Sequence, residues 1–127
     1  MKIKASFEIE DETIENLLVG AIEGGSNYWY WIDKLPSNFP TNGEPFSINL
    51  FDFVWNFKGK VEVCDVESNP QKPEVLGTLS KESMINAIEL ISKDYPNVLS
   101  NIIEDNYDAW DSDTFFQLAV MGKVIFG

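Results

Sequence analysis

The sequence contains no histidine and no arginine, and it has a single cysteine. Without histidine there is no imidazole to act as a general base, to pair with a nucleophilic serine or to bind a metal ion. Without arginine there is no bidentate clamp for phosphate. Cys64 cannot form a disulfide within the chain, which is typical of a reducing compartment, and its apolar neighbours suggest a small buried residue. These absences favour a protein that is not an enzyme and that needs no cofactor or metal.

Basic residues are scarce as well, since nine lysines face 21 acidic residues and the net charge is −12. This balance disfavours direct binding to nucleic acid, whose affinity depends on basic side chains. It suits either solubility or a basic protein partner. The N-terminus lacks the apolar core of a signal peptide, and no apolar run approaches the length of a membrane span. We therefore expect one soluble, cytoplasmic domain of 127 residues.

Hydrophobic periodicity predicts the elements of this domain. Apolar residues alternate along four segments, which predicts strands at 2–9, 27–32, 49–66 (a hairpin that turns at Lys58-Gly59) and 123–126. Helical spacing predicts helices at 12–23, 81–94, 97–104 and 114–121. Proline, glycine and asparagine mark loops at 33–48 and 67–75. Loops as long as 33–48 are often binding loops or lids.

Capping residues refine the predicted helix ends. Asp11, Ser80 and Asp113 are the expected N-caps. Gly24 stands where a left-handed residue would end the first helix, and Gly122 would end the last one. The resulting order, β-α-β-β-β-α-α-α-β, predicts an α+β fold. We expect a mainly antiparallel or mixed sheet with about four helices packed on it.

The segment Glu23–Trp31 is the first candidate site, because a glycine pair precedes four consecutive aromatic residues. The glycine backbone could offer hydrogen-bond donors, and the rings could stack on a flat ligand. The alternative is a helix cap followed by a strand of the core. The candidate ligand-binding residues are Gly24, Gly25, Ser26, Asn27, Tyr28, Trp29, Tyr30 and Trp31.

A second candidate is an acidic segment without lysine, formed by Glu104, Asp105, Asp108, Asp111 and Asp113. These carboxylates could imitate phosphates toward a basic protein, bind a metal ion, or form a solvated face with a helix cap. The metal interpretation is weak, because Asp111-Ser-Asp113 lacks the other ligands and the glycine of a calcium-binding loop. No pattern of catalytic residues is present.

Two segments together resemble a known family. Glu-Gly-Gly-Ser-Asn-Tyr-Trp at 23–29, combined with the C-terminal segment 113–127 that contains Asp-Thr, Leu-Ala-Val and Phe-Gly, is similar to a family of small uncharacterised phage and prophage proteins. Lys93-Asp-Tyr-Pro96 is similar too. The resemblance covers both ends of the chain and implies a setting rather than a chemistry. It implies an accessory protein that blunts host defence in the host cytoplasm.

Two functions are consistent with these features. The first is binding without turnover of a small ligand, such as a nucleotide-like defence signal, at the aromatic segment. The second is inhibition of a basic, nucleic-acid-binding host effector by the acidic segment. An enzyme with a pair of carboxylates is a weaker third interpretation. We expect neither nucleic acid nor membrane as a direct partner, and we leave open a homo-oligomer.

Overall fold

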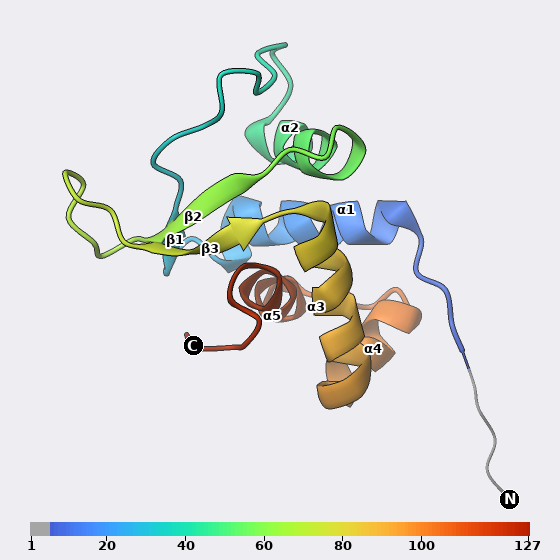
Figure 1. Cartoon of the computed structure of the whole chain (residues 1–127). Helices are drawn as coiled ribbons and strands as arrows, with labels where there is room; N and C mark the ends of the chain where they lie inside the picture. The colour runs from blue at the N-terminus through green and yellow to red at the C-terminus, as the bar shows by residue number, and fades with distance from the viewer. Residues whose placement is uncertain (1–5) are drawn as a thin grey trace, which may run out of the picture.

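The computed structural model describes residues 6–127 and combines helices with one small antiparallel sheet (Figure 1). Its helices are α1 (Asp11–Gly20), α2 (Phe46–Phe51), α3 (Lys81–Asp94), α4 (Pro96–Ile103) and α5 (Ala109–Met121). The π-helical turns η1 (Ala21–Gly25) and η2 (Asp52–Asn56) continue α1 and α2. Strands β1 (Tyr30–Trp31), β2 (Val61–Asp65) and β3 (Val75–Leu79) pair in the order β1-β2-β3. The predicted α+β class is confirmed.

Helix α5 occupies the middle of the molecule and contacts α1, η1, α3 and β3 (Figure 1). Between residues 111 and 120 its apolar side chains are almost completely removed from solvent, whereas Ala109 and Trp110 in its first turn are exposed. The buried residues of this helix are Asp111, Ser112, Asp113, Phe115, Phe116, Gln117, Leu118, Ala119 and Val120. The part of α5 after its first turn is buried on nearly all sides, so it belongs to the core rather than to the surface. The rest of the fold is therefore packed around α5.

The start of α5 differs from the prediction. The sequence favoured a helix 114–121 with Asp113 as its N-cap, but the helix begins at Ala109 and its N-cap is Asp108. Asp108 accepts a hydrogen bond from the backbone N–H of Asp111, and the Asp111 carboxylate accepts one from the N–H of Asp108. This reciprocal capping box stabilises the earlier start. Asp113 consequently lies inside the helix, and Gly122 ends it in the predicted left-handed conformation, with φ of 74°.

The predicted hairpin 49–66 is wrong in its first half. Residues 46–56 form α2 and η2, and only β2 follows the prediction. Period-two spacing of Phe51, Phe53 and Trp55 suggested a strand, but Leu50, Phe53 and Val54 also fit one helical face. Short apolar runs satisfy both patterns. The hairpin in the structure is β2–β3, where Val61 pairs with Leu79 and Glu62 with Thr78. The sequence predicted no strand at 75–79, so β3 was missed.

Other predicted strands are shorter or missing. The prediction 2–9 falls partly on residues 1–5, outside the described residues, and residues 6–9 are irregular. The prediction 27–32 is reduced to Tyr30 and Trp31, which pair with Asp65 and Cys64. Residues 123–126 form no strand. Strand β1 provides backbone pairing for only two residues of this segment, and hydrogen bonds from its side chains attach the other residues to the rest of the fold.

The helices at 81–94 and 97–104 are confirmed within one residue, and Ser80 caps α3 as predicted. Helix α1 starts at Asp11 itself, so Asp11 is not its N-cap, and Glu10 in that position makes no side-chain cap. Within residues 6–127, no helix combines the length and the apolar composition that crossing a membrane would require.

The end of α1 also differs from the prediction. Gly24 is not left-handed, since its φ is 168° and its ψ is −36°. The helix instead ends through η1, where the N–H of Ser26 donates to the carbonyl of Ala21 over 2.9 Å. Such i to i+5 closure widens the last turn without a left-handed residue. At this end of α1 the sterically restricted glycines are Gly20 and Gly25, where a Cβ would lie 2.6 Å from Ser112 Oγ and 2.8 Å from the Ala109 carbonyl oxygen.

We predict that Gly25→Ala lowers the free energy of unfolding by about 1–3 kcal/mol, because the methyl group would force η1 away from the backbone of α5. Gly24→Ala is the matched control, since a Cβ at Gly24 meets no atom within 4 Å. Equilibrium urea denaturation of both variants measures the difference. Equal midpoints for the two variants would contradict the close approach of η1 to Ala109.

Candidate functional site

The Asp113 carboxylate lies at the junction of α5 with the segment that follows η1. Asp113 is only 5% exposed to solvent. Oδ1 accepts hydrogen bonds from Ser26 Oγ over 2.7 Å and from Trp29 Nε1 over 2.8 Å. Oδ2 accepts from Tyr28 Oη over 2.6 Å and from Gln117 Nε2 over 3.1 Å. Four donors around one carboxyl group indicate the ionised form, which only accepts hydrogen bonds.

Gln117, one helical turn after Asp113, extends this network to the C-terminal segment. Its Oε1 accepts from the backbone N–H groups of Ile125 and Phe126, both over 2.9 Å. Its Nε2 donates to the carbonyl of Phe126 over 3.1 Å. One glutamine side chain thus replaces the strand partner that residues 123–126 lack. The segments 23–29 and 113–127, which lie far apart in the sequence, therefore meet through Asp113 and Gln117.

Tyr28 is held at its hydroxyl while its ring stays 51% exposed. Desolvation raises the pKa of Tyr28 to about 12, and the hydrogen bond and the negative charge of Asp113 add to the shift. Because the neutral phenol is favoured, the Tyr28 hydroxyl keeps its proton and donates a hydrogen bond to Asp113 over the whole neutral range. Its ring is therefore a fixed wall rather than a mobile surface side chain.

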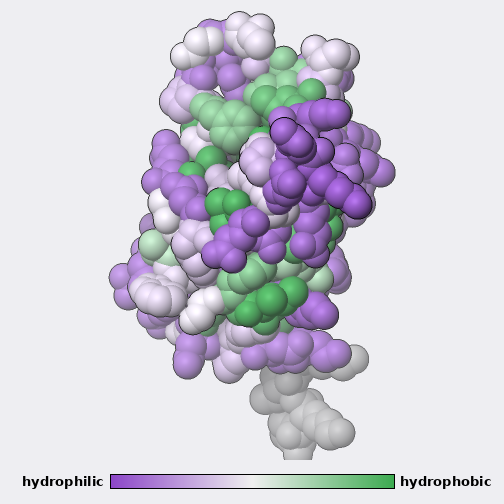
Figure 2. Space-filling model, turned by 90° about the vertical axis from the view of Figure 1, so that its left-hand side faces the viewer, coloured by the Kyte–Doolittle hydropathy of each residue, from purple (hydrophilic) through white to green (hydrophobic). Residues whose placement is uncertain are grey.

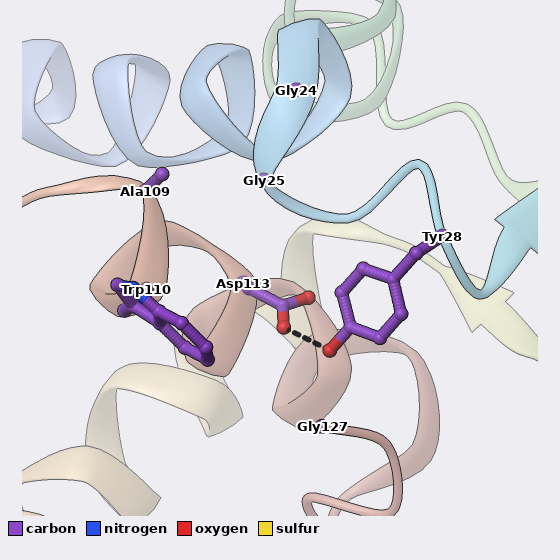
Figure 3. Close-up of a pocket in the computed structure, with 7 residues that line it drawn as sticks. All are labelled: Gly24, Gly25, Tyr28, Ala109, Trp110, Asp113 and Gly127. Carbon is purple, nitrogen blue, oxygen red and sulfur yellow. Dashed lines mark hydrogen bonds between the residues drawn. The ribbon is translucent and has the colours of Figure 1, made fainter.

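Beside Tyr28 lies a cavity of about 360 Å³ between the end of η1 and the first turn of α5. Figure 3 shows Trp110 on one side of it, Tyr28 on the other and the Asp113 carboxylate between them. The complete lining is Gly24, Gly25, Tyr28, Ala109, Trp110, Asp113 and Gly127. Trp110 is 74% exposed. In contrast, Trp29, a few residues after η1, is only 1% exposed and does not line the cavity. We name this hollow the Trp110–Tyr28 cavity.

A second hollow, of about 460 Å³, lies beside Tyr28 and is lined in addition by Trp29, Val66 and Phe126, among others. The face of the molecule that carries the C-terminal segment is turned toward the viewer in Figure 2. Hydrophobic surface appears there as separate patches between hydrophilic ones (Figure 2). Exposed apolar side chains of this region include Val66 and Ile125. Because Tyr28 lines this second hollow as well as the Trp110–Tyr28 cavity, the two hollows adjoin at Tyr28.

The structure distributes the aromatic candidate residues over different environments. Gly24, Gly25 and Tyr28 line the Trp110–Tyr28 cavity, and Asn27 is exposed outside its lining. Ser26 and Trp29 are buried and bind Asp113.

The Trp29 ring also stacks on Phe126, with centroids 5.4 Å apart. The other two aromatic candidates, Tyr30 and Trp31, are half-buried in β1. Burial raises the pKa of Tyr30 to about 12. Of the four rings, Tyr28 alone borders the Trp110–Tyr28 cavity.

Sequence reasoning missed Trp110 and Ala109, because it placed them before the last helix. Once α5 begins at Ala109, the spacing of 110, 113 and 117 puts Trp110, Asp113 and Gln117 on one helical face. The capping pattern Asp108-x-x-Asp111 was the signal that could have revealed this face.

The acidic candidate residues do not form one surface. Glu104, Asp105 and Asp108 are exposed, whereas Asp111 and Asp113 are buried. Asn101 Nδ2 donates to the Asp111 carboxylate over 3.1 Å. Desolvation raises the pKa of Asp111, and its hydrogen bonds with the Asp108 backbone and Asn101 oppose the rise. Among residues 6–127, no three side chains of the metal-binding types gather closely enough to hold a metal ion.

A comparison of the chain with protein-family models, curated proteins and solved structures gives no match in any of the three. We therefore infer function from the geometry of the cavity and its chemistry.

We predict that Asp113→Asn lowers the free energy of unfolding by about 2–4 kcal/mol, because an amide group would face donors and leave buried hydrogen-bonding groups unpaired. Asp94→Asn, on the exposed end of α3, is the control and should change it by less than about 0.5 kcal/mol. Thermal and urea denaturation measure both. A variant Asp113→Asn with wild-type stability would show that the four-donor network does not hold the fold together.

We also predict that two tyrosines ionise near pH 12 in the folded protein, and that Tyr28→Phe removes one of them. Absorbance at about 295 nm, read in the first milliseconds after a pH jump, detects phenolate before unfolding. The folded pKa of Tyr28 exceeds its unfolded value of 10, so its contribution to stability is complete below pH 10 and is lost as the pH rises toward 12. An unchanged amplitude near pH 12 in Tyr28→Phe would refute the assignment.

Proposed function

We propose that this protein binds a small flat ligand in the Trp110–Tyr28 cavity and does not turn it over. The observation that carries the proposal is the exposed indole of Trp110, which stands across an open cavity from a phenol ring that is fixed at its hydroxyl. A flat molecule between the two rings would cover apolar surface of both. Stacking of a base on one aromatic side chain contributes about 1–3 kcal/mol.

The size and rigidity of the cavity support this proposal. Its volume of about 360 Å³ lies within the range of about 300–1,000 Å³ that is typical of small-molecule sites. The Tyr28 wall is fixed by Asp113, and the glycine wall is fixed by the close approach of Gly25 to Ala109. A cavity whose walls are already ordered loses little conformational entropy when a ligand enters.

The lining also supports binding without catalysis. Both oxygens of Asp113, the carboxylate of this cavity, already accept hydrogen bonds from the protein. General-base catalysis needs an acceptor that can reach a substrate proton. The other side chains of the lining, from Tyr28, Ala109 and Trp110, include no nucleophile that a neighbouring base activates. Recognition is the function that these groups can perform.

The resemblance to phage and prophage proteins supplies a biological setting for this proposal. In that setting the flat ligand would be a host-defence signal with a nucleobase, and binding would sequester it. This biological setting rests on the sequence resemblance alone, and the chemistry of the cavity is argued independently of it.

The alternative function is inhibition of a basic, nucleic-acid-binding protein by acidic side chains. Of the five acidic candidates, Glu104, Asp105 and Asp108 remain available on the surface. We rank this proposal second, because the hydrogen bonds of Asp111 and Asp113 are made within the protein. Affinity for such a partner should fall steeply between low and high salt.

We predict that Trp110→Ala weakens ligand binding at least about fivefold without changing the stability of the free protein, because the ring is exposed and stacks only on the ligand. A panel of nucleosides, nucleotides and cyclic dinucleotides would be screened by thermal denaturation, where ligand at 100 times its Kd adds about 2.7 kcal/mol to the free energy of unfolding.

Phe57→Ala is the matched control, because Phe57 is another exposed ring, 70% exposed, outside the cavity lining. It should bind like the wild type. A ligand that stabilises all three proteins equally would place binding elsewhere, and a panel without any hit would refute the proposed function for nucleobase ligands.

A further inference from the structure

The charges around the Trp110–Tyr28 cavity bear on the kind of ligand it accepts. Its lining contains the Asp113 carboxylate and no lysine. The whole chain carries a net charge of −12. A negative field of this size repels anions and concentrates cations near the surface. An anionic ligand would therefore need local positive groups, and the side chains of the lining provide none.

The two rings favour a cation for a separate reason. The face of an aromatic ring carries the negative part of its quadrupole, and indole attracts cations most strongly among the aromatic side chains. Trp110 and Tyr28 both border the space in which a ligand would sit (Figure 3). A flat cation could stack on these rings and gain charge attraction at the same time. A neutral ring of the same shape would gain the stacking alone.

The backbone dipoles at the cavity have opposite signs. Gly24 and Gly25 are at the carbonyl end of η1, which continues α1 and is kinked at Gly24, and the carbonyl end of a helix is its negative end. Ala109 and Trp110 are at the amide end of α5, which is positive. Asp108 and Asp111 already occupy that end, because each accepts a backbone hydrogen bond there. The positive end of α5 is thus neutralised by two carboxylates of the protein. The negative end of η1 has no basic residue in its last turn to neutralise it, so it favours a positively charged ligand.

We propose that the ligand of this cavity is a flat cation, such as an N-alkylated heteroaromatic ring, rather than an anionic nucleotide. This inference rests on the proposed function and narrows its ligand class. The positive ring stacks between Trp110 and Tyr28, and the ionised carboxylate of Asp113 lies between these two rings. A nucleobase ligand would satisfy the inference if its ring carried a positive charge.

The test uses probes that share one ring and differ in charge: nicotinate (anionic), nicotinamide (neutral) and N1-methylnicotinamide (cationic). Guanosine and 7-methylguanosine at pH 6, where the methylated ring is cationic, form a second matched pair. Binding would be followed by the indole N–H signal of Trp110 in NMR spectra of the full chain. Trp110→Phe assigns that signal, since the wild type has four tryptophans and the variant has three.

We expect the cation of each set to bind at least about fivefold more tightly than its neutral partner, as cation–π attraction implies. Added salt should weaken the binding of the cationic probe and leave the affinity of the neutral probe unchanged. Equal or tighter binding of the neutral or anionic probe would overturn the charge inference and leave the proposed function standing. No saturable shift of the Trp110 signal with any probe, nor with the nucleotide panel, would overturn both.

Discussion

The buried carboxylate of Asp113 is the interaction on which this structure depends. Removing an ionised carboxylate from water costs several kcal/mol unless hydrogen bonds replace its hydration. Here four side-chain donors replace it, and three of them come from Ser26, Tyr28 and Trp29, more than 80 positions earlier in the chain. Any movement of this segment away from α5 would leave the buried charge with Gln117 as the one remaining donor of the four. The network therefore fixes the segment after η1 on α5 more strictly than a short strand could.

The same network determines which tryptophan is buried. The indole N–H of Trp29 needs an acceptor inside the protein, and Asp113 provides it. Its ring then packs beside Phe116 and Phe126 in the core. Trp110 lies one helical turn before Asp113 on α5, where the end of η1 passes, and the described part of the chain leaves its side chain 74% exposed. Its exposure follows from the position of Gly25, which brings the backbone of η1 against Ala109 and leaves the next side chain outside.

The sequence allows part of this arrangement to be predicted. Local signals are sufficient for α3, where Ser80 caps the helix, and for the end of α5, where Gly122 turns left-handed. They are insufficient where two local solutions compete. Asp108 and Asp113 are both good N-caps by residue type; the capping box with Asp111 favours Asp108, and the donors from residues 26–29 hold Asp113 inside the helix. Likewise, the run around Phe53 fits strand and helix, and packing against the core selects the helix.

The candidate site shows the same division between local and distant causes. The glycine pair and Tyr28 could be recognised from their composition, and they do line the cavity. The opposite wall, formed by Trp110, could not be assigned without knowing that the first turn of α5 meets η1. Conversely, Trp29 and Trp31 looked like ligand-binding rings because sequence shows their chemistry but not their burial. A dense aromatic segment is therefore ambiguous until its hydrogen-bond partners are known.

Exposure alone does not make Trp110 functional, because single exposed apolar side chains are normal on protein surfaces. Phe57 is nearly as exposed, at 70%, yet it lines none of the hollows described above. Trp110 differs in its surroundings: an ordered second ring, an ionised carboxylate and glycine backbone enclose one space beside it. Each of these walls is rigid for a structural reason, so the space persists without a ligand. The exposed Trp110 indole adds little to the core of the protein, and its position at the edge of a preformed cavity supports the proposed role in ligand binding.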